Sequence, residues 1–196
     1  VLFLDEFPEF DRRVIETLRQ PLEDRLISIS RARGSLTFPA DIMLVAAMNP
    51  CPCGNRGSSK ECICSLKQLA YYGRKMSGPI LDRIDLWISM PQVEYQKLAD
   101  DTSVHGESSK EVRARVRKAR DLQKDRFGKS PSRANAHMNL RDIKKFCALE
   151  SAEKRILEDA SRRLDLSARA YHRVLKVART IADLAESEKI KAEHIL

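Results

Sequence analysis

The first half of the chain alternates short apolar runs with stretches of helical or period-two spacing. Residues 1–4 form an apolar run that two acids end, which is typical of a buried parallel strand. Apolar residues then recur at helical spacing over 10–18 and predict a helix of about three turns that Pro21 interrupts. Alternation over 26–38 predicts a β-hairpin. A second apolar run at 42–48, stopped by Asn-Pro, predicts another buried strand.

The pattern loses its regularity after this second run. Residues 51–60 are rich in Gly, Ser, Pro and Cys and predict an irregular loop. A short helix is expected over 66–74, and a third strand over 86–90, where Pro91 closes it.

Beyond residue 92 the spacing becomes helical. Ser108 and Glu111 stand at capping-box spacing ahead of an apolar face, and Asn139 and Ser167 each precede another helical pattern. The predicted fold is α/β: a partial parallel sheet with a β-hairpin insertion, followed by an all-α domain. The partial sheet is predicted at residues 1–92, a linker at 93–109 and the all-α domain at 110–196.

Composition narrows the class of protein. With 196 residues, 42% of them hydrophobic, the chain can build a core, which excludes a disordered tail. Lys and Arg number 36 against 28 acids, and this net charge of +8 favours a polyanionic partner such as nucleic acid or nucleotide. No apolar run approaches the ~20 residues that span a bilayer, and no signal-peptide pattern opens the chain. We therefore expect a cytoplasmic protein with no membrane partner.

Two acids follow the first strand, and an amide follows the second. Asp5 at the carboxyl end of a buried strand has the form of a Walker B element, where an Asp holds Mg²⁺ on a nucleotide and the next acid, Glu6, polarises water. Asn49 could orient that water without adding negative charge. Each of these residues also fits an ordinary solvated strand end, so none of them alone is specific for a nucleotide site.

Two arginines stand in unusual surroundings. Arg83 lies between Asp82 and Asp85, either as a surface ion pair or as an arginine finger that reaches a neighbouring subunit's nucleotide. Arg169 falls in the first turn of the last long helix, where the helix dipole disfavours a cation unless a phosphate lies nearby.

Taken in order, these segments resemble the AAA+ ATPases, in particular the magnesium-chelatase-like, competence-associated branch that includes ComM and YifB. The resemblance is carried by VLFLDEFPEF at 1–10, AAMNPCPCG at 46–54, SGPILDRIDL at 77–86 and LSARAYHRVLKVARTIADLA at 166–185.

The resemblance assigns a role to each candidate residue. It implies that Asp5 and Glu6 are Walker B, that Asn49 is sensor 1, that Arg83 is the arginine finger acting in trans, and that Arg169 is sensor 2. It further implies ATP and Mg²⁺ as cofactors, a homo-oligomeric, hexameric ring whose pore the 26–38 hairpin faces, and DNA as the polymer that is remodelled by helicase or branch-migration activity.

One family element is missing from these residues. They contain no Gly-x-x-x-x-Gly-Lys-Ser/Thr loop to cradle the β- and γ-phosphates. The chain thus resembles the C-terminal portion of a longer ATPase, and alone it is expected to bind ATP poorly and hydrolyse it negligibly. A magnesium-chelatase ATPase subunit is the alternative within the family. A non-catalytic, zinc-stabilised nucleic-acid-binding or adaptor module is the alternative from another class.

Four of the five cysteines are clustered, at positions 51, 53, 62 and 64. Four thiolates in so short a span suit one tetrahedral Zn²⁺ with no open position for catalysis, and hence a structural role. The one-residue gaps in Cys51-x-Cys53 and Cys62-x-Cys64 are tighter than usual, and a redox-labile loop or inert thiols are the other interpretations.

Basic residues are concentrated at one place in the helical half. Residues 107–133 carry ten Lys or Arg against four acids, which is six of the net eight positive charges. A solvated helix face explains this bias, and contact with DNA or RNA phosphates is the functional reading.

Overall fold

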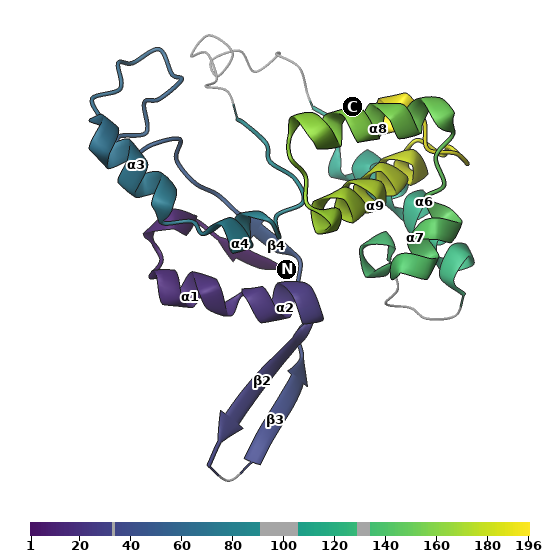
Figure 1. The fold of residues 1–196 in the computed structure, drawn as a ribbon, viewed down its shortest axis with the longest axis horizontal. Coiled ribbons are helices and arrows are strands. Elements are labelled where there is room, and N and C mark those ends of the chain that lie inside the picture. Colours follow the sequence, from purple (N-terminus) through teal and green to yellow (C-terminus); the bar gives the residue numbers. More distant parts are fainter. Residues whose placement is uncertain (33, 91–105, 129–133) are drawn as a thin grey trace. The chain divides into compact units, whose positions relative to one another are not determined.

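A computed structural model describes residues 1–32, 34–90, 106–128 and 134–196. The chain divides into two compact units, Val1–Glu94 and Tyr95–Leu196 (Figure 1). Most of the predicted linker at 93–109 lies outside the described residues. No helix in the described part of the chain is both long and apolar enough to cross a membrane.

The first unit is organised around two parallel strands. β1 (Leu2–Leu4) pairs with β4 (Leu44–Ala46), so that Leu2, Phe3 and Leu4 lie opposite Leu44, Val45 and Ala46. The ladder continues past both strands, because Ala47 donates its backbone N–H to Leu4 O and Phe7 donates to Ala47 O, each at 2.9 Å. The two predicted apolar runs therefore form neighbouring strands that end at the same edge.

The helix predicted over 10–18 is observed as two short ones. After a 3₁₀ turn η1 (Phe7–Glu9), α1 (Arg12–Thr17) is followed by α2 (Arg19–Asp24). The break falls at Leu18, ahead of the predicted interruption. Pro21 instead lies in the first turn of α2, where a proline removes no backbone donor that the helix needs.

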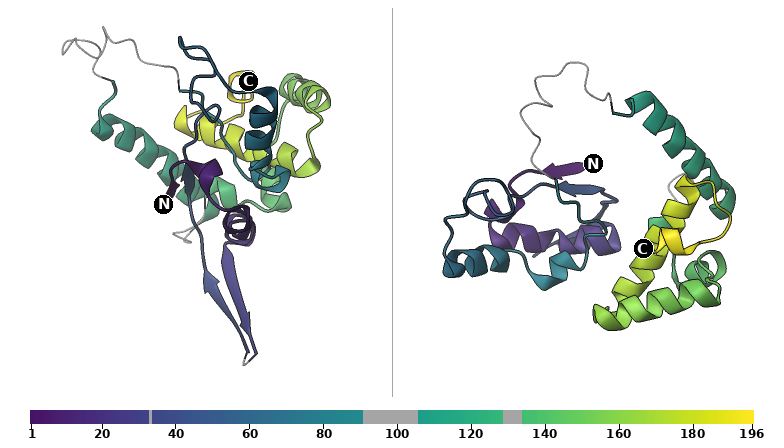
Figure 2. Two further views of the ribbon diagram at one scale, coloured as in Figure 1. Left: turned by 90° about the vertical axis from the view of Figure 1, so that its left-hand side faces the viewer. Right: turned by 90° about the horizontal axis from the view of Figure 1, so that it is seen from above.

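The predicted β-hairpin is confirmed. β2 (Leu26–Arg31) pairs antiparallel with β3 (Gly34–Pro39) and extends away from the helices of its unit (Figures 1 and 2). Both strands are exposed throughout. One face carries cross-strand pairs of apolar residues, and the other carries hydroxyl pairs, with Ser28 opposite Thr37 and Ser30 opposite Ser35.

The rest of the first unit is helix and loop. α3 (Leu66–Arg74) has the predicted bounds, and its N-cap Ser65 forms a capping box with Gln68. α4 (Gly78–Leu81) follows. A small buried cluster joins η1, α1 and α4 to the turn between α3 and α4; its members are Phe7, Ile15, Met76 and Ile80.

The third predicted strand is wrong. Residues 86–90 are not in a strand, and their large apolar side chains Leu86, Trp87, Ile88 and Met90 are exposed. A strand exists only when a neighbour supplies ladder hydrogen bonds, and within the described residues β1 and β4 pair only with each other. An apolar run alone therefore does not specify a strand.

In the described residues of the second unit, every regular element is a helix. Its elements are α6 (Ser109–Phe127), η2 (Asn135–His137), α7 (Leu140–Phe146), α8 (Ser151–Arg163), α9 (Ala168–Leu184) and η3 (Ala192–His194). The predicted caps hold: Ser108, Asn139 and Ser167 each accept a backbone N–H of the helix that follows.

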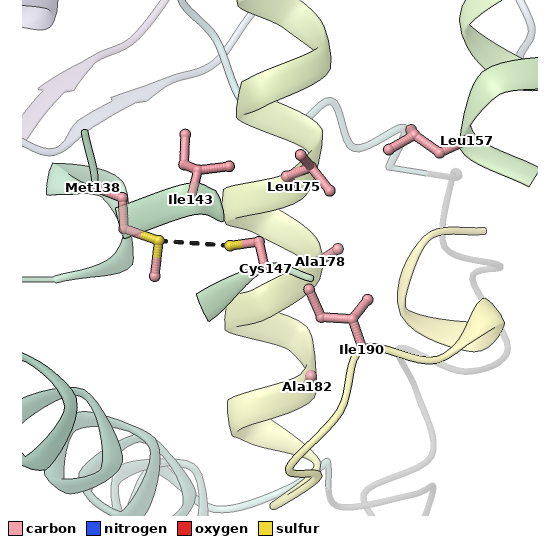
Figure 3. Packing of buried hydrophobic residues seen from close by; sticks show 8 residues of the cluster. All are labelled: Met138, Ile143, Cys147, Leu157, Leu175, Ala178, Ala182 and Ile190. Carbon is pink, nitrogen blue, oxygen red and sulfur yellow. Dashed lines mark hydrogen bonds between the residues drawn. The ribbon is translucent and has the colours of Figure 1, made fainter. Parts of the chain in front are cut away.

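The core of the second unit surrounds α9 (Figure 3). Leu175, Ala178 and Ala182 of α9 pack with apolar side chains from the neighbouring elements, and the Cys147 thiol lies 3.6 Å from Met138 Sδ. Cys147 is thus a core residue, as its apolar neighbours in the sequence indicate.

A buried ionic network holds the helices of this unit together. Asp183 is fully buried and accepts two hydrogen bonds from the Arg126 guanidinium, at 2.6 and 2.7 Å, one from Arg179 Nε at 3.0 Å and one from the Asn135 amide at 2.7 Å. Arg179 also donates to the main-chain carbonyls of Ser187 and Glu188. The network connects α6, η2 and α9 to the segment that follows α9.

Candidate nucleotide and metal sites

Three of the predicted catalytic side chains gather at one edge of the β1–β4 pair. Asp5, Glu6 and Asn49 line an open cavity of about 300 Å³, together with Ala47 and Met48. All three are exposed. The carboxyl edge of parallel strands is where α/β folds bind ligands, because the loops there diverge and leave a crevice. Two carboxylates facing an amide can hold a hydrated cation and orient a water molecule.

Glu6 adopts a backbone conformation that is rare for a side chain of its size. Its φ of 49° and ψ of 42° lie in the left-handed region. The reversal aims the chain into η1 and buries Phe7, while the Glu6 N–H donates to Asp5 Oδ1 at 2.9 Å. Strained backbone of this kind is concentrated at functional sites, where the surrounding structure compensates for it.

The main-chain oxygen of Asn49 is bound by a residue that the sequence analysis did not single out. Tyr72 of α3 is buried, and its hydroxyl donates to the main-chain oxygen of Asn49 at 3.0 Å. Burial raises the pKa of Tyr72, and the charges of Glu9 and Cys51 add to the effect. The two partners lie 23 residues apart in the sequence. No sequence pattern marks a contact over such a separation.

Arg83 points into its own chain. Its Nη2 donates to Glu23 of α2 and its Nη1 donates to the main-chain oxygen of Pro79, and the side chain is 10% exposed. Glu23 is the second residue that the sequence analysis missed. For Arg83 to reach another subunit, it would have to leave Glu23.

Arg169 lies on a different compact body. It is exposed in the first turn of α9, as predicted, and belongs to the second unit, whereas Asp5, Glu6 and Asn49 belong to the first. Its role as sensor 2 stays a prediction.

The four clustered cysteines converge. All four sulfurs lie within 4.8 Å of one another, and those of Cys51, Cys53 and Cys62 are separated by 3.4, 3.6 and 3.7 Å. Sulfurs bound tetrahedrally to zinc at about 2.3 Å lie about 3.8 Å apart. The arrangement therefore fits one zinc ion with Cys51, Cys53, Cys62 and Cys64 as ligands.

The main chain of the loop favours thiolates at two of these positions. Although burial works in the opposite direction, the pKa of Cys51 is lowered because the Arg56 N–H donates to its sulfur at 3.4 Å. The N–H of Asn55 lowers the pKa of Cys53 to about 6. Burial raises the pKa of Cys64 to about 12. A bound cation would supply the charge that ionises the remaining thiols.

One face of α6 carries cations that form no ion pair with any described residue. Lys110, Arg113 and Arg117 recur at three- and four-residue steps, are exposed, and have no ion-pair partner in the ranges that the structure describes. Other cations of the segment are paired: Arg115 with Glu107, Lys118 with Glu186, Lys124 with Asp121, and Arg126 with Asp183. The available positive surface is thus smaller than the count of basic residues indicates.

Comparison with known families places the chain in a class. It belongs to the magnesium chelatase family: magnesium chelatase subunit ChlI matches residues 1–98, and the ChlI C-terminal region matches residues 106–196.

Individual relatives agree with this assignment. Competence protein ComM of Haemophilus influenzae is 46% identical over 195 residues, which cover 100% of this chain and 37% of that protein. YifB of Escherichia coli K12 is 44% identical over 196 residues, with the same coverage, and Mb2921c of Mycobacterium bovis is 38% identical over 185 residues, 94% of this chain and 36% of that protein. The chain therefore spans a little over a third of the length of these relatives and lies in the ComM/YifB branch of the family.

Proposed function

We propose that this chain supplies the Walker B, sensor 1, arginine-finger and sensor 2 residues of an AAA+ ATPase that remodels DNA. The first unit is then the C-terminal part of the α/β core, and the second unit is its helical lid. The observation that carries the proposal is the convergence of Asp5, Glu6 and Asn49 around one cavity at the carboxyl edge of parallel strands.

Each residue has a defined task in this proposal. Asp5 would hold Mg²⁺ on the nucleotide, and Glu6 would draw a proton from the attacking water. The Asn49 amide fixes that water without adding negative charge. Arg83 of a neighbouring subunit and Arg169 of the lid neutralise charge on the γ-phosphate, which requires an oligomeric ring, in our proposal a hexamer.

DNA is the polymer that the charge distribution favours. The exposed cations of α6 present a row of donors to phosphates, and the name of the Haemophilus relative places that protein in competence. We propose helicase or branch-migration activity in the complete ATPase, in the cytoplasm. A chelatase subunit would use the same nucleotide residues but would not need the α6 cations.

The cysteine cluster is proposed to hold one structural zinc ion. Four sulfur ligands complete a tetrahedron and leave no site for a substrate, so the ion would stabilise the 51–64 loop and take no part in chemistry. A non-catalytic, zinc-stabilised module is the competing function, and it would need the zinc ion without needing Glu6.

A chimera tests the proposal. This chain would replace the matching 195 residues of Haemophilus ComM, and ATP hydrolysis and strand displacement of forked DNA would be measured. Glu6→Gln should lower turnover by at least about a hundredfold, the lower range for loss of a general base, while leaving ATP binding in place. Glu61→Gln, an exposed acid in the cysteine loop, is the control. Turnover that does not distinguish the two variants would refute the ATPase assignment.

A further inference from the structure

α3 is connected to the candidate nucleotide site through one buried side chain. Tyr72 is the only buried residue of α3, all of whose residues are described, and is 8% exposed. Two other large side chains of the helix are exposed: Tyr71 is 69% exposed and Leu66 is 86% exposed. The position of the helix therefore depends on Tyr72 far more than on an apolar face, and the Tyr72 hydroxyl ends on Asn49.

The end of the same helix reaches the 3₁₀ turn η1, which follows the other strand of the site. Lys75, the C-cap of α3, forms an ion pair with Glu9 at 2.6 Å, and its ammonium lies 5.9 Å from the centre of the Tyr72 ring. The Glu9 N–H in turn donates to Glu6 O at 2.7 Å. One helix thus contacts Asn49, in the segment after β4, through Tyr72, and Glu9, three residues after Glu6, through Lys75.

The cysteine cluster closes the loop between Asn49 and α3. Cys51 follows Asn49 by two residues, and Cys64 precedes the first residue of α3 by two, with the N-cap Ser65 between them. The intervening loop has no helix or strand. Fixing the two ends of such a loop removes much of its conformational freedom, and an ion shared by all four sulfurs would do so at both ends at once.

We propose that Tyr72 is a positioning residue that couples the cysteine cluster to Asn49. A metal ion in the cluster fixes the start of α3, the helix carries Tyr72 to the Asn49 carbonyl, and the hydrogen bond sets where the Asn49 amide lies relative to Glu6. The role of Asn49 in this coupling rests on the proposed function. The dependence on the metal rests on the proposed zinc ion, and the hydrogen bond itself is observed.

Hydrogen exchange on the full chain tests the coupling without any activity. Amide exchange of the peptide 44–49 would be measured with one equivalent of zinc and with a chelator. In the natural sequence and in Tyr71→Phe, zinc should slow exchange by about fivefold, the worth of one neutral hydrogen bond. In Tyr72→Phe the exchange should be fast and independent of zinc, although the variant still binds one zinc ion.

A second variant removes the metal by a different route. Cys53→Ser should give fast exchange of 44–49 with the Tyr72 hydroxyl intact, which separates loss of the ion from loss of the hydrogen bond. Tyr72→Phe that behaves like Tyr71→Phe would overturn the proposal, and so would a chain that binds no zinc.

Kinetics in the ComM chimera provide the functional test. Tyr72→Phe should lower kcat by about tenfold with KM for ATP unchanged, because a displaced Asn49 misplaces the water and not the nucleotide. Equal loss in kcat and in ATP affinity would indicate general damage and overturn the positioning role. A chimera that never hydrolyses ATP, with the exchange difference intact, would refute the ATPase proposal and support the coupling.

Discussion

At the scale of single residues, some functional residues can be predicted from their chemistry and their place at strand ends, whereas others are set only by how the chain packs. The carboxylates Asp5 and Glu6 and the amide of Asn49 could be predicted because strand ends in an α/β fold bring such groups to one edge. Glu23 and Tyr72 could not, because each acts through a partner far along the chain, Arg83 and Asn49 respectively. Their residue types carry no signal, and only the packed structure reveals them.

The arginine finger prediction concerns Arg83. In the ComM chimera, Arg83→Ala should leave ATP binding nearly intact and lower turnover by roughly 10³-fold, as expected for an arginine finger. Mixing it with Glu6→Gln subunits should restore part of the activity, since each supplies what the other lacks. Steady-state ATPase rates across mixing ratios measure this effect.

Glu23→Gln serves as the control for the same prediction. It breaks the ion pair but keeps the arginine, so turnover should not fall if Arg83 works in trans. A loss as large as that of Arg83→Ala, with no recovery on mixing of co-assembled subunits, would mean that the pair only stabilises the fold.

A stability prediction concerns Asp183. Asp183→Asn leaves the buried Arg179 and the partly buried Arg126 without a counter-charge, and should lower the free energy of unfolding of the second unit by about 3 kcal/mol. Asp159→Asn, on an exposed position of α8, should change it little. Urea unfolding followed by circular dichroism measures both variants, and equal stabilities would show that the network contributes nothing net.

The same residue gives a pH dependence. Burial opposes it, but hydrogen bonds from Arg126 and Asn135 and the charges of Arg126 and Arg179 lower the pKa of Asp183 below its unfolded value. Asp183 therefore contributes stability that is fully present above about pH 4 and is lost as the pH falls through the folded pKa. Urea midpoints between pH 6 and 3 should fall more steeply for the natural sequence than for Asp183→Asn.

At the scale of elements, periodicity and caps were reliable and isolated apolar runs were not. α3, the hairpin and the capped helices were all predictable, because their signals lie within the element. The segment 86–90 was wrongly predicted as a strand, because pairing depends on a neighbour that its own sequence does not describe. The predicted end of the helix at Pro21 is wrong, and the break lies at Leu18, because proline is tolerated in the first turn of a helix.

The α6 face makes a testable prediction about nucleic acid. Changing Lys110, Arg113 and Arg117 together to Gln should weaken DNA binding and flatten its dependence on salt by up to about three counterions. A matched triple variant removes the same charge from cations already held in ion pairs, at Arg115, Lys118 and Lys124. Fluorescence anisotropy across a salt series compares the two triple variants. Equal slopes would mean that α6 is a solvated helix face that does not contact phosphates.

At the scale of the whole molecule, the two units have separate means of stabilisation. The second has an apolar core around α9 and a buried ionic network, whereas the first has a small cluster of four buried residues and the cysteine loop. A core of so few buried side chains contributes little free energy of folding, and a metal ion or a partner is a common supplement to such a core. The first unit is therefore expected to depend on zinc.

Selective chelation tests that dependence. Protein purified without added metal should contain about one zinc ion per chain by elemental analysis, and removing it should lower the melting temperature of the first unit by at least about 5 °C. Trp87, the single tryptophan, reports on the first unit by fluorescence, while helical circular dichroism weights the second. A common shift in both signals, or none, would contradict the prediction.

The exposed hairpin also bears on how the protein behaves in concentrated solution. β2 and β3 pair only with each other among the described residues, so each strand keeps an outer edge of main-chain donors and acceptors, beside an apolar stripe of Ile27, Ile29, Leu36 and Phe38. Open edges of this kind template strand addition from other molecules. Unless a partner covers it, the hairpin is the place where amyloid-like association would begin. Ile29→Lys would place a charge in the apolar stripe and so oppose such association.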